Sequence, residues 1–241
     1  MDARSQRIYL EALGIPLYRR RGGASAMVEG SGGSAARADF IPEADAEEAP
    51  LPGERPDTLE SLRDEVADCV SCPLHQTRTQ TVFGVGDPEA RIMFVGEAPG
   101  AEEDRRGEPF VGRAGQLLDA MLAAIGLDRK GGGVFIANVL KCRPPNNRDP
   151  KPEEVAQCEG YLRRQIEVIQ PRVLVALGRV AAQQLLQTQQ PLARLRGAEH
   201  RFHETPVLVT YHPAYLLRNP ADKAKAWADL KVIRERGSGR Q

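Results

Sequence analysis

The stretch Arg91–Gly115, RIMFVGEAPGAEEDRRGEPFVGRAG, decides how the rest of the chain is interpreted. It begins with an apolar run at 92–95 that is typical of a buried β-strand, and this run stops at the Gly/Pro-rich turn 96–100. A short charged loop then leads through Phe110 into an expected helix. A strand, a turn and a helix in this order are typical of a ligand site at the carboxyl end of a parallel strand. The carboxylate of Glu97 and the Phe110 ring form a pair that nucleotide chemistry often needs, although the loop could simply reverse the chain.

The length and charge of the chain restrict its class. With 241 residues, it can bury one sizeable core plus an appendage. No apolar run approaches the roughly 18 residues of a membrane span, and a signal-peptide core is missing. We therefore expect a cytoplasmic monomer without membrane contact. The net charge is zero, but residues 38–68 hold eleven acidic and two basic residues, which leaves residues 69–241 with an excess of six positive charges. That excess is compatible with a polyanionic partner.

The first 56 residues are expected to lie outside the compact domain. Residues 1–21 are interpreted as an N-terminal amphipathic helix followed by three arginines. Residues 22–56 contain few large apolar residues, so we expect a disordered acidic linker. The helix could bind a protein partner or fold back on its own domain.

Residues 57–235 are expected to form one domain. Near-continuous apolar runs predict four strands, at 91–95, 134–140, 173–177 and 206–211. Helical patterns lie before, between and after them. Alternating helices and buried strands are typical of a parallel sheet covered on both faces. We therefore predict an α/β fold, a three-layer α/β/α sandwich with a central four-stranded parallel sheet.

Four cysteines form a candidate metal site: Cys69, Cys72, Cys142 and Cys158. The first two can bind one centre from a tight turn. Cys142 ends a strand and Cys158 lies on the next helix, so both can reach a shared corner. Four thiolates suit tetrahedral zinc or a [4Fe–4S] cluster, and their spacing does not distinguish these metals. The alternative is that Cys142 or Cys158 is only a small buried apolar residue.

With these features, residues 57–235 closely resemble the family 4 uracil-DNA glycosylases, the iron–sulfur branch of that superfamily. The resemblance rests on the order of the cysteines and on three motifs, GEAPGAEEDRRGEPFVGRAG at 96–115, NVLKCRPPNNRDP at 138–150 and YHPAYLLR at 211–218. It implies a DNA repair enzyme that flips uracil out of DNA and hydrolyses its N-glycosidic bond, leaving an abasic site. It also implies a [4Fe–4S] cluster on the four cysteines.

The resemblance implies uracil contacts at the turn Gly96–Ala98 and at Phe110, Asn138 and His212. Phe110 would supply a stacking face. The Asn138 amide would accept a hydrogen bond from uracil N3–H and donate one to O4, a pattern that cytosine reverses. His212 would donate, as a neutral imidazole, to the negative charge that develops on uracil O2.

The motifs do not define the group that activates water. In family 1 enzymes the equivalent turn carries an aspartate as general base, but this chain has Ala98 there. The neighbouring Glu97 could position water, line the pocket near uracil C5 or only brace the turn, so its catalytic role is a hypothesis. No lysine lies where a Schiff-base nucleophile is expected, and we therefore expect hydrolysis without strand cleavage.

Residues 213–218 are expected to form a loop that faces DNA. Leu216 is the candidate to enter the space left by the flipped base, with Tyr215 and Leu217 as rivals and core packing as the alternative. Several cationic side chains are candidates for phosphate contacts: Arg218, Arg143, Arg148, Lys141 and Arg113.

Two other classes compete with this interpretation. One is a non-enzymatic, four-cysteine nucleic-acid-binding module that holds zinc. The other is a Rossmann-like nucleotide enzyme, which is disfavoured because neither GxGxxG nor GxxxxGK[ST] follows a strand.

Overall fold

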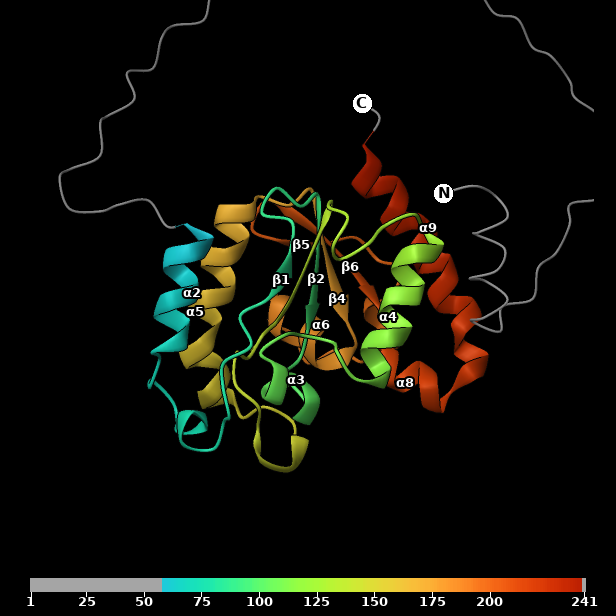
Figure 1. Cartoon of the computed structure of the whole chain (residues 1–241). Helices are drawn as coiled ribbons and strands as arrows, with labels where there is room; N and C mark the ends of the chain where they lie inside the picture. Colours follow the sequence, from blue (N-terminus) through green and yellow to red (C-terminus); the bar gives the residue numbers. More distant parts are fainter. Residues whose placement is uncertain (1–57, 240–241) are drawn as a thin grey trace, which may run out of the picture. The chain divides into compact units, whose positions relative to one another are not determined.

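A six-stranded mixed sheet forms the centre of residues 58–239, the part of the chain that this computed structural model describes (Figure 1). The helix and linker predicted for residues 1–56 lie outside the described residues. The strand order is β1-β3-β2-β4-β6-β5. The four inner strands pair in parallel and correspond to the four predicted ones: β2 (Ile92–Gly96), β3 (Val134–Asn138), β4 (Val173–Leu177) and β6 (Thr205–Thr210).

Two short strands extend the sheet beyond the prediction. β1 (Val85–Gly86) pairs antiparallel with β3, and β5 (His200–Phe202) pairs antiparallel with β6. The predicted four-stranded parallel sheet is therefore the core of a larger mixed sheet. Neither edge strand has an apolar run, because β1 contains two residues and β5 contains a histidine and an arginine.

Helices cover both faces of the sheet, as the three-layer prediction requires (Figure 1). One face carries α2 (Leu59–Ala67), α5 (Pro152–Ile169) and α6 (Arg179–Leu185), and the other carries α4 (Arg113–Ala124) and α9 (Lys223–Ser238). Successive strand residues point to opposite faces. Met93 therefore enters the first core and Phe94 the second.

Short helices complete the fold: η1 (Pro73–Gln76), α3 (Ala101–Arg106), η2 (Pro145–Asn147), α7 (Leu192–Leu195), α8 (Pro213–Arg218) and η3 (Pro220–Asp222). Two of them correct the prediction, because α3 was expected to be a charged loop and α8 a DNA-facing loop. The acidic first turn and basic last turn of α3 complement the helix dipole, and Gly107 ends the helix at φ 73°. In α8, Pro213 occupies the first turn, where its missing N–H costs nothing.

The connections leave a crevice beside β2. The chain passes from β2 to β3 on one side, and then returns through α5 to β4 on the other side. Ligands in open α/β sheets bind at the carboxyl ends of the strands next to such a reversal. Gly96 and Asn138, the last residues of β2 and β3, are paired there. Within residues 58–239, no helix has the length and apolar character needed to cross a bilayer.

Candidate active site

A cleft of about 480 Å³ opens at the carboxyl ends of the parallel strands. Four segments far apart in the sequence line it: the turn after β2, the loop between α3 and α4, the end of β3 with the loop that follows, and the residues after β6. Most of the predicted site residues are brought together here: Glu97, Ala98, Phe110, Asn138, His212, Arg148 and Arg218.

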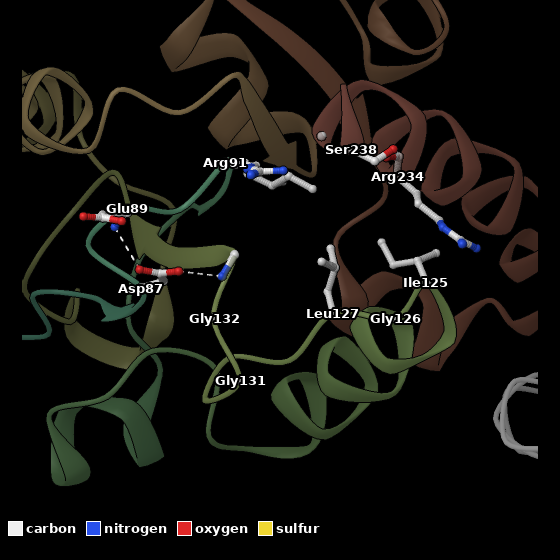
Figure 2. A pocket seen from close by; sticks show the side chains of 13 residues that line it. Asp87, Glu89, Arg91, Ile125, Gly126, Leu127, Gly131, Gly132, Arg234 and Ser238 are labelled. Atoms are coloured by element: carbon white, nitrogen blue, oxygen red, sulfur yellow. Dashed lines mark hydrogen bonds between the residues drawn. The ribbon is translucent and has the colours of Figure 1, made fainter. Parts of the chain in front are cut away.

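A second cleft, of about 700 Å³, lies near Arg91 and Ile92, at the amino end of β2 (Figure 2). Its Asp87 carboxylate accepts hydrogen bonds from the backbone N–H groups of Glu89 and Gly133, at 2.9 and 2.7 Å. Asp87 therefore already has partners and braces the surrounding loops. The smaller cleft differs from this one, because one of its lining residues has a buried polar atom with no hydrogen-bond partner among the described residues.

That atom is Oδ1 of Asn138. The residue is 2 % exposed, and no described residue donates a hydrogen bond to this oxygen. Burying an unpaired polar atom costs about 1–3 kcal/mol, so its presence in a cleft favours a ligand that supplies the missing donor. Gly96 keeps the space beside it open, because a Cβ there would lie 2.4 Å from Oδ1 of Asn138 and 2.7 Å from Cζ of Phe110.

Phe110 forms an aromatic wall of the cleft. Its ring centroid lies 5.5 Å from that of His212, and the two planes are tilted by 34°. Its backbone has φ 54°, in the left-handed region that bulky residues rarely adopt. Glu103 holds the following residues in place, because its Oε1 accepts hydrogen bonds from the N–H groups of Val111 and Gly112 at 2.9 and 3.1 Å.

His212 caps the start of α8 and is neutral at pH 7. Its Nδ1 accepts a hydrogen bond from the Ala214 N–H at 3.1 Å, which leaves the ring proton on Nε2. Burial, together with the positive charge of Arg218, lowers the pKa of His212 to about 4. Gly178, directly after β4, allows His212 to approach, because a Cβ at position 178 would lie 2.8 Å from the His212 Cβ. His212 can therefore donate a hydrogen bond without carrying a charge.

Glu97 lines the cleft with a carboxyl of raised pKa. Burial raises its pKa to about 7, with a further increase from Asp149 and an opposing effect from Arg179. A carboxyl with this pKa is well matched to proton transfer at neutral pH. Asp104, a nearby carboxylate, is instead buried and accepts hydrogen bonds from the N–H and the hydroxyl of Thr79, at 2.9 and 2.7 Å.

The structure contradicts the prediction that Leu216 faces DNA. Because residues 213–218 form a helix rather than a loop, Leu216 points inward and packs in the second core, where it is 1 % exposed. Leu217, on the outer side of α8, is 37 % exposed. Tyr215 lines the cleft, with its ring stacked on that of Tyr211 at a centroid distance of 5.2 Å. The rivals Tyr215 and Leu217 are therefore placed better than Leu216 to meet DNA.

The arginines predicted to bind phosphate differ in exposure and in the hydrogen bonds that their guanidinium groups already make. Arg218 is exposed at the cleft, whereas the Arg148 guanidinium forms two hydrogen bonds to the buried carboxylate of Glu154, at 2.5 and 2.9 Å. Arg143 donates through Nε to Oδ1 of Asn147 at 2.7 Å. Arg148 thus braces its loop, and any DNA contact by this residue has to share the guanidinium with Glu154.

Lys141 is not available to a phosphate. It is 1 % exposed, and its Nζ donates to the Asn138 carbonyl oxygen at 2.8 Å and to Oε1 of Gln165 at 2.6 Å. Its prediction as a DNA contact is wrong, because the side chain turns inward under the loop after β3. There it supports the backbone of Asn138.

The four cysteines line one small cavity: Cys69, Cys72, Cys142 and Cys158. All four are free thiols. Nη1 of Arg78 donates to the sulfur of Cys142 at 3.2 Å, and the Lys141 N–H donates to that of Cys158 at 3.3 Å. Such donors suit thiolate ligands. Within the described part of the chain, no three His, Cys, Asp or Glu side chains are arranged to hold a metal ion as they stand.

Two residues that shape the site were not predicted from the sequence: Gly178, and Arg129, whose guanidinium donates to the carbonyl oxygens of Pro109 and Phe110. The position of Gly178, directly after an apolar strand, was an available signal of close backbone approach. Arg129 lies outside all three motifs, and no sequence pattern marks it.

Known proteins resemble this chain over the region that contains the cleft. Residues 83–231 match the family model of the uracil DNA glycosylase superfamily. A type-4 uracil-DNA glycosylase of Archaeoglobus fulgidus is 48 % identical over 188 residues, which cover 73 % of this chain and 94 % of the relative. The type-4 enzyme of Sulfurisphaera tokodaii is 46 % identical, covering 74 % and 84 %, and that of Thermotoga maritima is 45 % identical, covering 71 % and 89 %.

Proposed function

This chain belongs to the type-4 uracil-DNA glycosylases of the uracil DNA glycosylase superfamily, and we propose that it releases uracil from DNA by hydrolysing the N-glycosidic bond. The observation that carries the proposal is the unpaired Oδ1 of Asn138 in the cleft. Uracil offers an N3–H donor to that oxygen and an O4 acceptor to the amide nitrogen. Cytosine offers the reverse pattern and would leave the buried groups unpaired.

The site residues have separate roles in base capture. A base must leave the duplex stack before its glycosidic bond can be reached. Phe110 replaces part of the lost stacking, which is worth about 1–3 kcal/mol per base in other nucleic-acid complexes. Asn138 reads the base edge, and the turn Gly96–Ala98 leaves room for the ring between them.

His212 and Glu97 act on the bond itself. When the bond between C1′ and N1 breaks, its electron pair moves into the uracil ring and negative charge accumulates on O2. The Nε2–H of His212 stabilises that charge more strongly than it stabilises the ground state. Water adds to C1′ of the cation-like sugar, and Glu97 accepts a proton from it. The pKa of Glu97 near 7 supports this assignment.

We also propose that the four cysteines bind a [4Fe–4S] cluster. Four sulfurs around one cavity, with N–H donors to two of them, fit the chemistry of that group. When bound, the cluster supplies a covalent cross-link between the segment before β1, the loop after β3 and α5. We expect the purified protein to be brown, to absorb visible light and to contain iron. A colourless protein that contains zinc would contradict the cluster.

An excision assay with matched substrates tests the activity. The full chain, purified anaerobically, is incubated with duplexes that differ only in carrying uracil, thymine or cytosine at one position. Alkali-labile strands are expected from the uracil duplex alone, and no strand break is expected before alkali treatment. DNA binding without released uracil would instead favour the four-cysteine zinc module, which the glycosylase relatives make the weaker candidate.

A further inference from the structure

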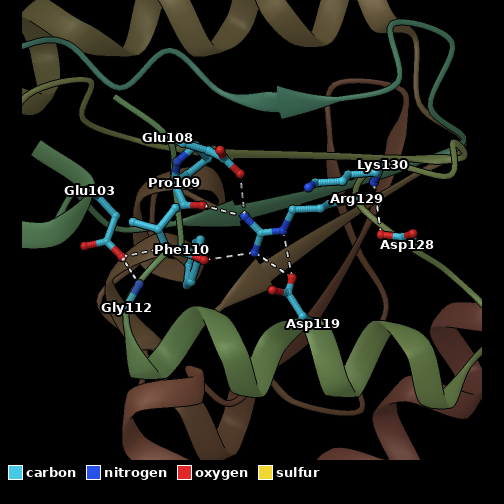
Figure 3. A network of polar contacts seen from close by, with 10 residues as sticks. Glu103, Glu108, Pro109, Phe110, Gly112, Asp119, Asp128, Arg129 and Lys130 are labelled. Atoms are coloured by element: carbon cyan, nitrogen blue, oxygen red, sulfur yellow. Dashed lines mark hydrogen bonds and ion pairs between the residues drawn. The ribbon is translucent and has the colours of Figure 1, made fainter. Parts of the chain in front are cut away.

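Arg129 is a buried cation that contacts the backbone of the Phe110 loop (Figure 3). It lies after α4 and is 8 % exposed. Its Nη2 donates to the Phe110 carbonyl oxygen and its Nη1 to that of Pro109, both at 2.9 Å. Arg129 is not among the residues that line the cleft, so any effect on uracil has to pass through this loop.

Two carboxylates hold the guanidinium in place. Nε of Arg129 donates to Oδ1 of Asp119 at 2.7 Å, and Nη1 donates to Oε1 of Glu108 at 3.1 Å (Figure 3). The guanidinium therefore spans two side chains and two carbonyl groups at once. A rigid fork with five N–H donors can do this, whereas a lysine ammonium cannot reach the same four partners.

The Phe110 backbone needs such support. A bulky residue at φ 54° is strained, and strained conformations persist only where the surroundings determine them. Glu103 binds the N–H groups that follow Phe110, while Arg129 binds the carbonyl groups at and before it. Helix α4 closes the third side, because a Cβ at Gly115 would lie 1.7 Å from the Phe110 carbonyl oxygen.

We propose that Arg129 is a positioning residue for uracil capture, which holds Phe110 in the left-handed conformation that makes its ring a wall of the cleft. This inference rests on the proposed function and extends it to a residue outside the three motifs. The strain is local, and Arg129 contacts the carbonyl groups of the loop without lining the cleft itself. Its removal should therefore affect uracil binding and excision mainly through the position of the Phe110 ring.

A double-mutant cycle with Arg129→Ala and Phe110→Ala tests this route. Single-turnover excision at saturating enzyme and inhibition by free uracil are measured for the wild type, both single variants and the double variant. Arg129→Ala is expected to lower the excision rate about tenfold or more, since small displacements of site residues carry losses of this size. It is also expected to weaken the inhibition of the enzyme by free uracil. When Phe110 is already alanine, Arg129→Ala should change neither the excision rate nor the inhibition by free uracil by more than about twofold.

Controls separate positioning from a general loss of structure. Arg236→Ala removes an exposed arginine paired with Glu199 at 3.1 Å, and should leave excision unchanged. Arg129→Lys keeps the charge without the fork and should resemble Arg129→Ala, and it replaces that variant in the cycle if the alanine protein does not fold. Losses that multiply in the double variant, or a wild-type rate for Arg129→Lys, would overturn the proposal. A wild type that releases no uracil would overturn the proposed function itself.

Discussion

Replacing Asn138 with aspartate tests whether an amide reads the uracil edge. The two side chains have nearly the same shape, but an ionised carboxylate only accepts hydrogen bonds, so it can pair with N3–H and not with O4. The side chain is 2 % exposed, which means that water cannot replace the lost partner. Leaving O4 unpaired costs about 1–3 kcal/mol, which corresponds to a loss of about 5- to 150-fold in rate.

The assay compares single-turnover excision from duplexes with uracil or cytosine at the same position. Asn138→Asp should lose uracil excision in that range and gain activity on cytosine, because the carboxylate oxygen that replaces the amide nitrogen can accept a hydrogen bond from the cytosine amino group. Asn146→Asp adds the same charge to an exposed neighbouring position and should change DNA affinity rather than the rate at saturating enzyme. An Asn138→Asp variant that excises uracil at the wild-type rate would refute the edge-reading role.

Three further predictions concern the same cleft. His212→Ala should lower the single-turnover rate about 10²- to 10³-fold with little change in DNA affinity, and equal losses in both would contradict its role on the developing charge. Because the pKa of Glu97 is about 7 and the base must be ionised, the rate should rise about tenfold per pH unit below pH 7 and level off above it. Glu97→Gln should remove this dependence, and a Gln variant with the wild-type rate would exclude Glu97 as the base. Gly96→Ala places a methyl group 2.4 Å from Oδ1 of Asn138. This overpacking should lower the free energy of unfolding by about 1–3 kcal/mol. It should also weaken inhibition by free uracil, and unchanged inhibition would show that uracil does not use this space.

The inner sheet could be predicted because its strands are almost uninterrupted apolar runs, which is what burial on both faces requires. The helices α3 and α8 were missed for different reasons. The sequence AEEDRR of α3 has no apolar stripe, and its helical conformation depends on charges that complement the dipole and on Gly107. The short helix α8 follows a histidine and a proline, a beginning that also suits a loop.

The residues predicted to contact the base come together at one cleft because they belong to long motifs at strand ends, and their contacts with uracil stay a prediction. The size of the pKa shifts in this site could not be predicted, because these shifts arise from tertiary surroundings. Burial sets the pKa of Glu97 and of His212. The inward turn of Lys141 depends on Gln165, which is 24 positions away in the sequence, and only the fold brings these two residues together.

The two edge strands protect the sheet from association with a second chain. A long unpaired edge exposes a row of N–H and C=O groups that can template intermolecular β-pairing. Here β1 is only two residues long, and β5 is three residues long with an exposed arginine, Arg201, at its centre. Both are too short or too charged to recruit another strand readily. The short edge strands β1 and β5 thus keep the apolar inner strands from pairing with another chain.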